Sequence, residues 1–564
     1  MKKFKLRKSS FVEGTFIATF CIVLVKIMGM LYVIPFYKMV GTQGAALYAY
    51  AYSIYNMFLD ISTVGLPIAI SKVTKEYNTL KKYDAKARAY KMAMKLMRYA
   101  SIIIFAILFL FAGQIGQLII HDLKGGNTPE GIASVIRCVS FAILVIPYLS
   151  VTKGYLQGHN VINIPSVSNV IEQIIRISII LIGCYLIIDV WNKSYILGVQ
   201  VALTGAFFSG LFAYLYVRFR MHSNKEELSL GKLEKKDDIS NKEIAKKIWL
   251  YALPYIIINC MSSLYGFADM IEIMYGLDWI NIYETQTIEF IATSASTWCG
   301  KINVIVLSIA MGMTMSLIPN IVESFTLKDW KGVNDKINTS LRMITFIALP
   351  MTIGLSLLSK PVWAIFYGNY EIGNGFMSAN IGSHMLSVSV FIGLALNFYM
   401  ISSSILQSLN KFKEVYLITI VGFLFNLIFN IPALFLFKWI GIPCYLGVPT
   451  VSACGYGLSA ILALHLVKKD EKSINYKPAL KTIGKIFIPS ICMLLVVLIS
   501  RYYIPLDIDS NFSIILYLAI NAVIGAIVYF IVSWRMNLFN EVFGQDGLKR
   551  YTNKIFGIFK KKKS

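Results

Sequence analysis

The sequence predicts an all-α protein that crosses a membrane many times, and its composition, its apolar segments and its charge distribution all favour this class. Of 564 residues, 57% are hydrophobic and only 15% are charged, with a mean hydropathy of +0.64. Average soluble domains carry roughly 25% charged residues, so a soluble chain of this length lacks the charge to cover its surface. The hydrophobic content also excludes a disordered chain. A protein whose outer surface faces lipid remains.

Fourteen segments are apolar and long enough to span a bilayer, whose core of about 30 Å needs roughly 20 apolar residues per helix. The basic start of the chain resembles a signal peptide, but its apolar stretch continues to Pro35 without a small-residue cleavage site, so we expect an uncleaved first span. The predicted spans are about 11–37, 45–70, 92–118, 132–152, 164–188, 195–217, 247–275, 298–321, 340–366, 378–404, 413–437, 447–467, 482–503 and 511–534.

The basic residues test this count independently, because Lys and Arg concentrate in cytoplasmic loops. With the N-terminus inside, the inner stretches 72–98 and 218–247 carry nine basic residues each, and the tail from Arg535 carries eight. The seven outer loops together carry six, namely Lys38, Lys124, Lys193, Lys360, Lys438 and Arg501. One span more or fewer would invert every later loop. We therefore predict fourteen membrane-spanning helices with both termini cytoplasmic.

Three local matches predict an internal duplication of six helices. Tyr155-Leu156-Gln157-Gly158-His159-Asn160 corresponds to Ile405-Leu406-Gln407-Ser408-Leu409-Asn410 at an offset of 250, and the pairs Pro67/Pro319 and Arg98/Arg342 lie at offsets of 252 and 244. Copies with an even number of spans share one orientation and enclose a central cavity. The expected organisation is a first lobe at 1–220, a cytoplasmic linker at 221–246, a second lobe at 247–470, and two further helices with a basic tail at 471–564.

Motifs of enzymes and metal sites are missing from the sequence. The eight Cys include no CxxC pair, and Walker A, HExxH and GxSxG patterns are absent. The nearest candidate for a phosphate loop, Lys124-Gly125-Gly126-Asn127, is typical of a turn. The net charge of +24 suits anionic lipid headgroups rather than nucleic acid. Two lobes around a cavity favour an alternating-access transporter over a channel or an enzyme, without cofactor or metal.

Charged residues inside predicted spans are the candidate functional residues, because each costs about 2.5–3.5 kcal/mol at the bilayer centre on insertion scales. These residues are Lys26, Asp60, Arg137, Glu172, Arg176, Asp269, Glu272 and Lys301. Simpler roles stay open for some of them. Glu172 and Arg176 have the spacing to pair with each other, Arg137 can reach the outer interface, and Asp269 with Glu272 can lie at that interface.

The functional interpretation places Lys26 and Lys301 in the central cavity, from different lobes. Ammonium groups in a wet cavity attract an anion such as a phosphate or diphosphate. Arg137, Glu172 and Arg176 are further candidates for substrate binding. The carboxylates Asp60, Asp269 and Glu272 are candidates for charge balance or for coupling to Na⁺ or H⁺. Gly65, Pro67 and Pro319 are candidates for kinks that bend between transport states.

Several stretches resemble one bacterial family. They are Leu31-Tyr32-Val33-Ile34-Pro35-Phe36, Gly44-Ala45-Ala46-Leu47-Tyr48-Ala49-Tyr50, Gly65-Leu66-Pro67-Ile68-Ala69-Ile70-Ser71-Lys72, Gly154-Tyr155-Leu156-Gln157-Gly158 and Val170-Ile171-Glu172-Gln173-Ile174-Ile175-Arg176. The chain resembles the stage V sporulation protein B-like polysaccharide-export family, which includes MurJ-type lipid II flippases and belongs to the multidrug/oligosaccharidyl-lipid/polysaccharide exporter superfamily. The resemblance covers about residues 1–470.

This resemblance implies a V-shaped pair of six-helix lobes and the flipping of an undecaprenyl-diphosphate-linked sugar, with lipid II as the first choice. Lys26 matches the basic residue of the family's first-span motif, and Lys301 matches a basic residue of the cavity. Tyr32 and Val33 stand where some members carry a basic–acidic pair, which leaves the headgroup open. The last two helices would form a groove for the lipid tail.

Three alternatives remain at this stage. A cation-coupled multidrug exporter of the same superfamily would depend on Asp60 or Asp269. An exporter of polysaccharide repeat units would share the lipid carrier but take another headgroup. A scaffold that recruits cell-wall synthases through its basic loops would tolerate the loss of every cavity charge.

Overall fold

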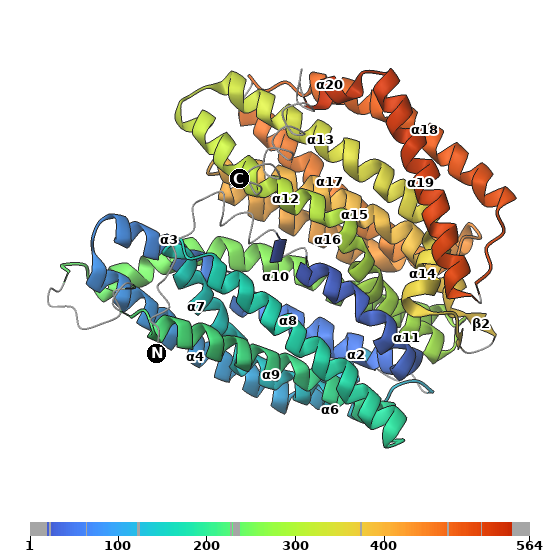
Figure 1. The fold of residues 1–564 in the computed structure, drawn as a ribbon, viewed down its shortest axis with the longest axis horizontal. Coiled ribbons are helices and arrows are strands. Elements are labelled where there is room, and N and C mark those ends of the chain that lie inside the picture. Colours follow the sequence, from blue (N-terminus) through green and yellow to red (C-terminus); the bar gives the residue numbers. More distant parts are fainter. Residues whose placement is uncertain are drawn as a thin grey trace, which may run out of the picture. The chain divides into compact units, whose positions relative to one another are not determined.

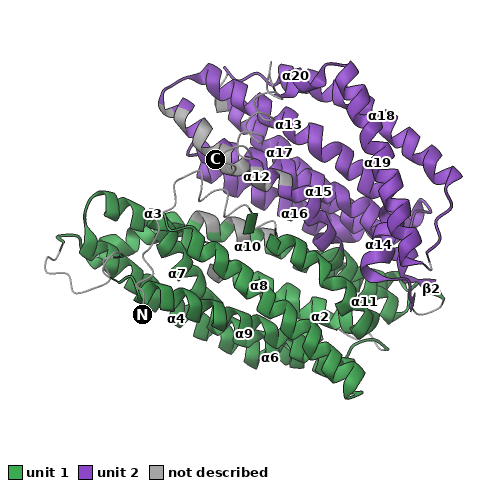
Figure 2. Ribbon diagram, viewed as in Figure 1, with its two compact units in different colours: residues 1–298, 372–375 green, residues 299–371, 376–564 purple. Residues whose placement is uncertain are grey.

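The computed structural model describes residues 20–21, 24–63, 65–120, 125–225, 228, 237–372, 375–470, 473–508 and 510–543. Within these ranges nearly every residue lies in a helix (Figure 1). The chain divides into two compact units, of which unit 1 comprises residues 1–298 with 372–375 and unit 2 comprises 299–371 with 376–564 (Figure 2).

The elements of unit 1 are, in order, α2 (Val33–Thr63), α3 (Gly65–Thr79), α4 (Tyr83–Leu110), α5 (Ala112–Ile120), α6 (Pro129–Ser140), η1 (Phe141–Leu144), α7 (Ile146–Gly158), α8 (Asn163–Cys184), η2 (Tyr185–Val190), α9 (Tyr195–His222), α10 (Asn241–Ile280), α11 (Thr285–Thr293) and η3 (Ser294–Trp298). The segment η1 is a 3₁₀ turn, and η2 and η3 are π-helical. Because α10 packs on α2 and α3, it belongs to unit 1, although it follows the predicted linker 221–246. Packing and duplication define different divisions, so the lobe boundaries stay a prediction.

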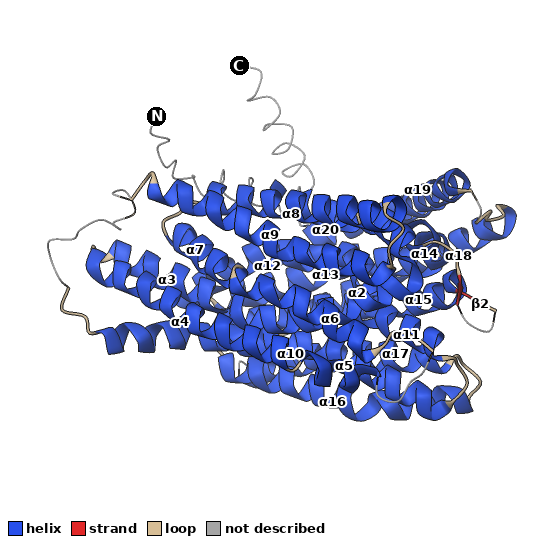
Figure 3. Cartoon of the chain, turned by 90° about the horizontal axis from the view of Figure 1, so that it is seen from below, coloured by secondary structure: helices blue, strands red, loops and turns tan. Residues whose placement is uncertain are grey.

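The helices of unit 2 are α12 (Cys299–Thr326), α13 (Trp330–Leu357), α14 (Ser359–Tyr367), α15 (Ser378–Ser408), α16 (Phe412–Trp439), η4 (Cys444–Leu446), α17 (Gly447–Asp470), α18 (Lys477–Tyr503), α19 (Asn511–Arg535) and α20 (Leu538–Phe543). In the described part of the chain, the only strands are β1 (Glu371–Ile372) and β2 (Phe376–Met377), which pair as a short hairpin between α14 and α15 (Figure 3).

Twelve helical stretches among the described residues have the length and hydropathy of membrane spans. One of them, Leu24–Leu59, contains parts of two predicted spans, because the backbone breaks at Gly41 with φ 67° and ψ −175°. A further predicted span, 247–275, lies within the 40 residues of α10. The twelve stretches are thus consistent with the predicted fourteen crossings, and the all-α multi-pass class is confirmed.

The ends of corresponding helices repeat one geometry in the two halves of the sequence. Asn160 and Asn410 both adopt the left-handed conformation, with φ of 60° and 59°. In each case the next residue donates its N–H to the carbonyl five residues earlier, at 3.0 and 2.9 Å, which closes a Schellman cap. Lys81 and Lys328 repeat this left-handed end at an offset of 247. The duplication predicted from sequence therefore has a counterpart in local structure.

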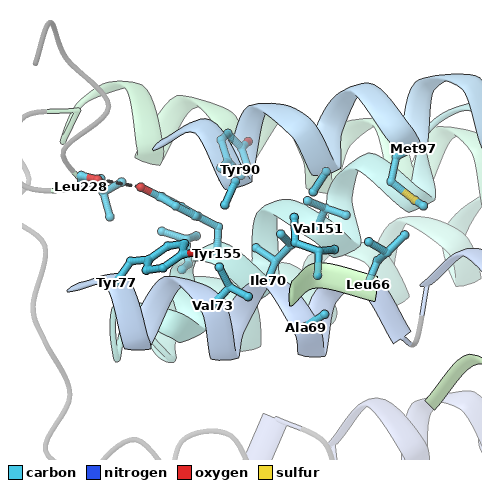
Figure 4. Packing of buried hydrophobic residues seen from close by; sticks show 14 of the residues in the cluster. Leu66, Ala69, Ile70, Val73, Tyr77, Tyr90, Met97, Val151, Tyr155 and Leu228 are labelled. Atoms are coloured by element: carbon cyan, nitrogen blue, oxygen red, sulfur yellow. Dashed lines mark hydrogen bonds between the residues drawn. The ribbon is translucent and has the colours of Figure 1, made fainter. Parts of the chain in front are cut away.

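Close packing of α7 on α3 forms the core at one end of unit 1. A Cβ at Gly154 would lie 2.4 Å from the carbonyl oxygen of Pro67, and one at Gly158 would lie 2.7 Å from that of Ser71. Glycines four residues apart let two helices approach this closely. Beside this contact, Tyr155 donates a 2.8 Å hydrogen bond to the carbonyl of Leu228, which is fully buried (Figure 4). The linker is therefore anchored to the helices at this residue.

Candidate substrate-binding site

Four side chains from two neighbouring helices of unit 1 form a polar cluster within helical stretches that have the length and hydropathy of membrane spans. Asn169, Glu172 and Arg176 follow one another at spacings of three and four residues, so α8 presents them on one face. Lys153 of α7 donates to Asn169 Oδ1 at 2.7 Å and to Glu172 Oε2 at 3.1 Å. Arg176 Nη2 donates to Glu172 Oε1 at 2.6 Å. We call Lys153, Asn169, Glu172 and Arg176 the basic cluster.

The basic cluster has an excess of positive charge in a largely buried position. Its two cations share one carboxylate, and the side chains of Lys153, Glu172 and Arg176 are 14%, 17% and 20% exposed. Arg176 Nε is buried and has no hydrogen-bond partner among the described residues. A guanidinium with a spare donor and an unbalanced positive charge together favour the binding of an anion.

Tyrosines of α2 form a wall beside Arg176. Tyr48, Tyr52 and Tyr55 line, with Arg176, a cavity of about 10 Å³. The rings of Tyr48 and Tyr52 stack at 5.6 Å between centroids, and Tyr48 also stacks on Trp298 at 6.3 Å. The guanidinium therefore lies next to a rigid aromatic surface, and the space at its side holds one water molecule at most.

The predicted residue Lys26 lies on the helical segment that contacts α8. A Cβ at Gly29 would lie 3.1 Å from Gln173 Nε2, so this segment approaches α8 immediately beside Glu172. Lys26 is three residues before Gly29, which places both on a similar face of the helix, about 4.5 Å apart along its axis. Its side chain is partly buried. Lys26, Glu172 and Arg176 thus come from adjacent elements of unit 1.

The other predicted residues lie on helices other than α7 and α8. Arg137 is exposed on α6, where it donates to the carbonyl of Phe109 at 3.4 Å and covers that ring at 5.9 Å, as expected for a side chain that reaches the interface. Asp269 and Glu272 are both 9% exposed on α10. Lys301 is partly buried on α12 of unit 2, three residues after η3.

The predicted kink residues have different outcomes. A Cβ at Gly65 would lie 2.7 Å from the carbonyl of Ala252, so this glycine allows α3 and α10 to touch. Pro67 contacts Gly154 as described above. Asp60 and Pro319 lie in α2 and α12, but their side chains are outside the described residues.

A second polar site, missed in the sequence, involves the Gly-Gly-Asn turn. Glu289 of α11 is fully buried and accepts hydrogen bonds from the backbone N–H of Asn127 at 2.7 Å and from its Nδ2 at 2.9 Å. A Cβ at Gly126 would lie 2.4 Å from Glu289 Oε1, and Gly125 has φ 99°. The turn therefore binds an anion after all, but the anion is a side chain of the same protein.

Unit 2 contains an apolar cavity of about 730 Å³. Its lining comes mainly from α13, α18 and α19, and from Phe539 and Phe543 of α20. The short helix α20 is held in place by Glu541, whose carboxylate pairs with Lys485 and whose carbonyl accepts from Arg342 at 3.2 Å. Such a cavity suits a hydrocarbon chain.

Sequence reasoning missed Lys153 and Asn169 as well as Glu289. The predicted fourth span ended at residue 152, which placed Lys153 in a loop, whereas α7 continues to Gly158. The spacing of Asn169 to Glu172 was the available signal for a shared face. Glu289 precedes the predicted eighth span, so it was not considered as an intramembrane charge.

Comparison with known proteins identifies the family. The model described as polysaccharide biosynthesis protein matches residues 11–325, more than half of the chain. The chain belongs to this family. A MatE model matches residues 288–431 of this polysaccharide biosynthesis family member. Two curated relatives come from Bacillus subtilis (strain 168). Lipid II flippase MurJ is 28% identical over 545 residues, covering 95% of this chain and 97% of the relative. Stage V sporulation protein B is 20% identical over 378 residues, covering 64% and 68%.

Solved structures agree with this assignment of the fold. The inward closed conformation of lipid II flippase MurJ matches with a TM-score of 0.65 at 15% identity, covering 92% of this chain and 98% of that one. An inward-facing multidrug resistance MATE family transporter of the MOP superfamily matches at 0.61 and 14% identity, covering 79% and 94%. The resemblance predicted from sequence is confirmed. This polysaccharide biosynthesis family member therefore has the multi-pass membrane fold that these two transporters share.

Proposed function

We propose that this protein flips an undecaprenyl-diphosphate-linked sugar, with lipid II as the substrate, from the inner to the outer leaflet of a bacterial plasma membrane by alternating access. The observation that carries the proposal is the match to a lipid II flippase over 95% of this chain. The match includes the C-terminal helices α18 and α19, which lie beyond the region of the two family models.

The charges of the chain support an anionic headgroup. Lys26 and Arg176 come from adjacent elements of unit 1, and Lys301 lies on α12 of unit 2. A diphosphate offers several charged acceptor oxygens, which ammonium and guanidinium groups bind strongly. In our proposal each of these cations binds the diphosphate during transport, and Glu172 balances part of the charge of unit 1 before the substrate binds.

The apolar cavity of unit 2 supports a lipid carrier. Its lining by α13, α18, α19 and α20 is almost wholly hydrocarbon and aromatic. We propose that the polyprenyl tail lies in this cavity while the polar headgroup crosses elsewhere in the protein.

Transport in one direction needs an energy source. A ligand that binds both states equally shifts neither, so the substrate or an ion must distinguish the inward and outward states. A potential negative inside acts on a moving charge with about 2.3 kcal/mol per 100 mV. Asp60, Asp269 and Glu272 are the proposed sites for Na⁺ or H⁺ coupling. Contacts of the basic cytoplasmic loops with cell-wall synthases are a further proposal.

The test is transport by the full-length protein in proteoliposomes that contain lipid II. We expect lipid II to become accessible to an impermeant probe outside the vesicles at a rate that falls at least tenfold in the Lys301→Ala variant. The matched control is Lys193→Ala, at an exposed basic residue of a predicted outer loop, which should transport normally. Lipid II transport that stays at the level of empty vesicles would overturn the proposal.

The MatE match favours one competing function, a cation-coupled drug exporter. Cells that express the protein would then extrude a cationic dye in a manner that depends on Asp269. We expect no such efflux. Dye efflux without lipid II transport would replace the proposed function, and transport of a lipid-linked oligosaccharide in preference to lipid II would assign the protein to repeat-unit export.

A further inference from the structure

We propose that Glu172 is an internal substitute for the substrate's phosphate. In the empty transporter its carboxylate holds Lys153 and Arg176, and an incoming phosphate or diphosphate takes its place on these two cations. The inference deepens the proposed function and rests on it for the identity of the substrate, but the exchange itself concerns only the phosphate group.

The contacts of Glu172 are those that a phosphate would make. Its two oxygens bind two different cations, with Oε1 on Arg176 Nη2 at 2.6 Å and Oε2 on Lys153 Nζ at 3.1 Å. The cations come from two helices, α7 and α8, so the carboxylate bridges them as a bidentate anion would. Phosphate oxygens accept the same charge-assisted hydrogen bonds from guanidinium and ammonium groups.

Glu172 leaves a hydrogen-bond donor of Arg176 unused and the positive charge of the two cations only partly balanced. Arg176 Nε is buried without an acceptor among the described residues. Lys153 and Arg176 together carry two positive charges, and the one carboxylate of Glu172 leaves an excess of one positive charge. A phosphate has more oxygens and more charge than a carboxylate, so it can satisfy donors that Glu172 leaves open. We therefore expect Lys153 and Arg176 to bind a phosphate more strongly than they bind the carboxylate of Glu172.

Space requires an exchange rather than an addition. The cavity that Arg176 lines with Tyr48, Tyr52 and Tyr55 has about 10 Å³, enough for one water molecule at most. Since this cavity is too small for a phosphate, we expect a phosphate to bind Arg176 at the donor that Glu172 occupies, which requires the Glu172 side chain to leave it. The carboxylate then competes with the substrate, which weakens binding and at the same time drives release after transport.

Because of this competition, the affinity for an anion should change in one direction when Glu172 is replaced and in the other when Lys153 or Arg176 is replaced. Removing the charge at Glu172 strengthens anion binding, because the anion no longer displaces a competitor. Removing either cation weakens it. A carboxylate that merely braced the two cations in place would instead weaken anion binding when removed, because the cations would lose their orientation.

The experiment measures the Kd of inorganic pyrophosphate for the full-length protein in nanodiscs, at fixed ionic strength. We expect Glu172→Gln to lower the Kd about tenfold, and Lys153→Gln and Arg176→Gln to raise it about tenfold, in line with the strength of hydrogen bonds to charged groups. Lys153→Arg should keep binding near the native value. Lys193→Gln, at an exposed basic residue of a predicted outer loop, is the matched control, with an unchanged Kd.

Transport provides the second readout. Glu172→Gln should bind pyrophosphate more tightly yet transport lipid II more slowly, because release has lost its competitor. If this variant does not fold, Glu172→Asp, whose shorter side chain loosens one of the two contacts, should lower the Kd at least twofold. The inference is overturned if the Glu172 variants bind pyrophosphate more weakly than the native protein, or if Lys153→Gln leaves the Kd unchanged. Expected Kd changes without lipid II transport would support the exchange and overturn the proposed substrate.

Discussion

Lys26 is the single residue on which the proposed transport depends most directly. It lies one turn before Gly29, at the contact of the first helical segment with α8 beside Glu172. We expect the Lys26→Ala variant to reach the membrane at normal levels. Its rate of lipid II transport should fall at least tenfold, because the headgroup would lose a charge-assisted hydrogen bond. Lys26→Arg should keep most activity. Growth of cells in which the Lys26→Ala variant is the sole flippase would exclude this residue from the mechanism.

Individual residues were predictable where spacing alone decides their contacts. The ion pair of Glu172 and Arg176 follows from a separation of four residues on one helix, and the exposed position of Arg137 agrees with the simpler of its two interpretations. Lys153 was not predictable in this way, because its partners lie 16 and 19 residues further along the chain on another helix. Contacts between helices need the packing of both.

At the scale of elements, the approach of α7 to α3 should be sensitive to one methyl group. A Cβ at Gly154 would meet the backbone of Pro67 at 2.4 Å, and backbone cannot move aside as a side chain can. We expect Gly154→Ala to destabilise the protein by about 1–3 kcal/mol, measured as a lower thermal unfolding midpoint in detergent.

The matched control for this prediction is Gly484→Ala on α18, where a Cβ meets nothing within 4 Å. This substitution should be neutral or stabilising by up to about 1 kcal/mol, because alanine favours the helix over glycine. Equal midpoints for the two variants would show that α3 and α7 have room to separate.

The Gly-Gly-Asn turn and α11 form a second pair of elements held by one buried carboxylate. Asn127→Ala removes a donor from Glu289 and leaves a fully buried carboxyl group with one remaining hydrogen bond, so we expect the free energy of unfolding to fall by about 1–3 kcal/mol. Glu289→Gln should cost less, because its amide keeps an acceptor oxygen for the N–H of Asn127. The double variant should lose less stability than the two single variants lose together, as expected for residues in contact. Additive losses would contradict a direct coupling.

Elements were predictable to different degrees for physical reasons. The long apolar helices and their duplication followed from hydropathy and from short matches, and the left-handed ends at Asn160 and Asn410 agree with the latter. The break at Gly41 falls in the loop predicted between the first two spans, whereas the π-helical segment η3 and the six-residue helix α20 were not predicted. Each of them depends on a few residues whose conformation is fixed by neighbouring helices rather than by their own periodicity.

At the scale of the whole molecule, charge asymmetry is the feature that orients the chain in the membrane. The inner stretches predicted from sequence hold most of the 54 basic residues, whereas the outer loops hold six. We expect this bias to resist translocation and to keep the basic loops inside. Lipid II assembled in the inner leaflet would then meet the basic side of the protein first.

The orientation can be tested with single cysteines in a variant whose eight native cysteines are replaced. Lys75 and Lys477 are exposed in predicted inner regions, and Lys193 and Lys438 are exposed in predicted outer ones. In intact cells an impermeant maleimide should label Lys193→Cys and Lys438→Cys, and it should label the other two only after permeabilisation. If the stretch Leu24–Leu59 crossed the membrane once instead of turning back near Gly41, an inside N-terminus would put Lys75 outside and Lys193 inside. The reversed labelling pattern at these two positions would therefore show that the first half has one span fewer than predicted. The two repeats would then not share one orientation.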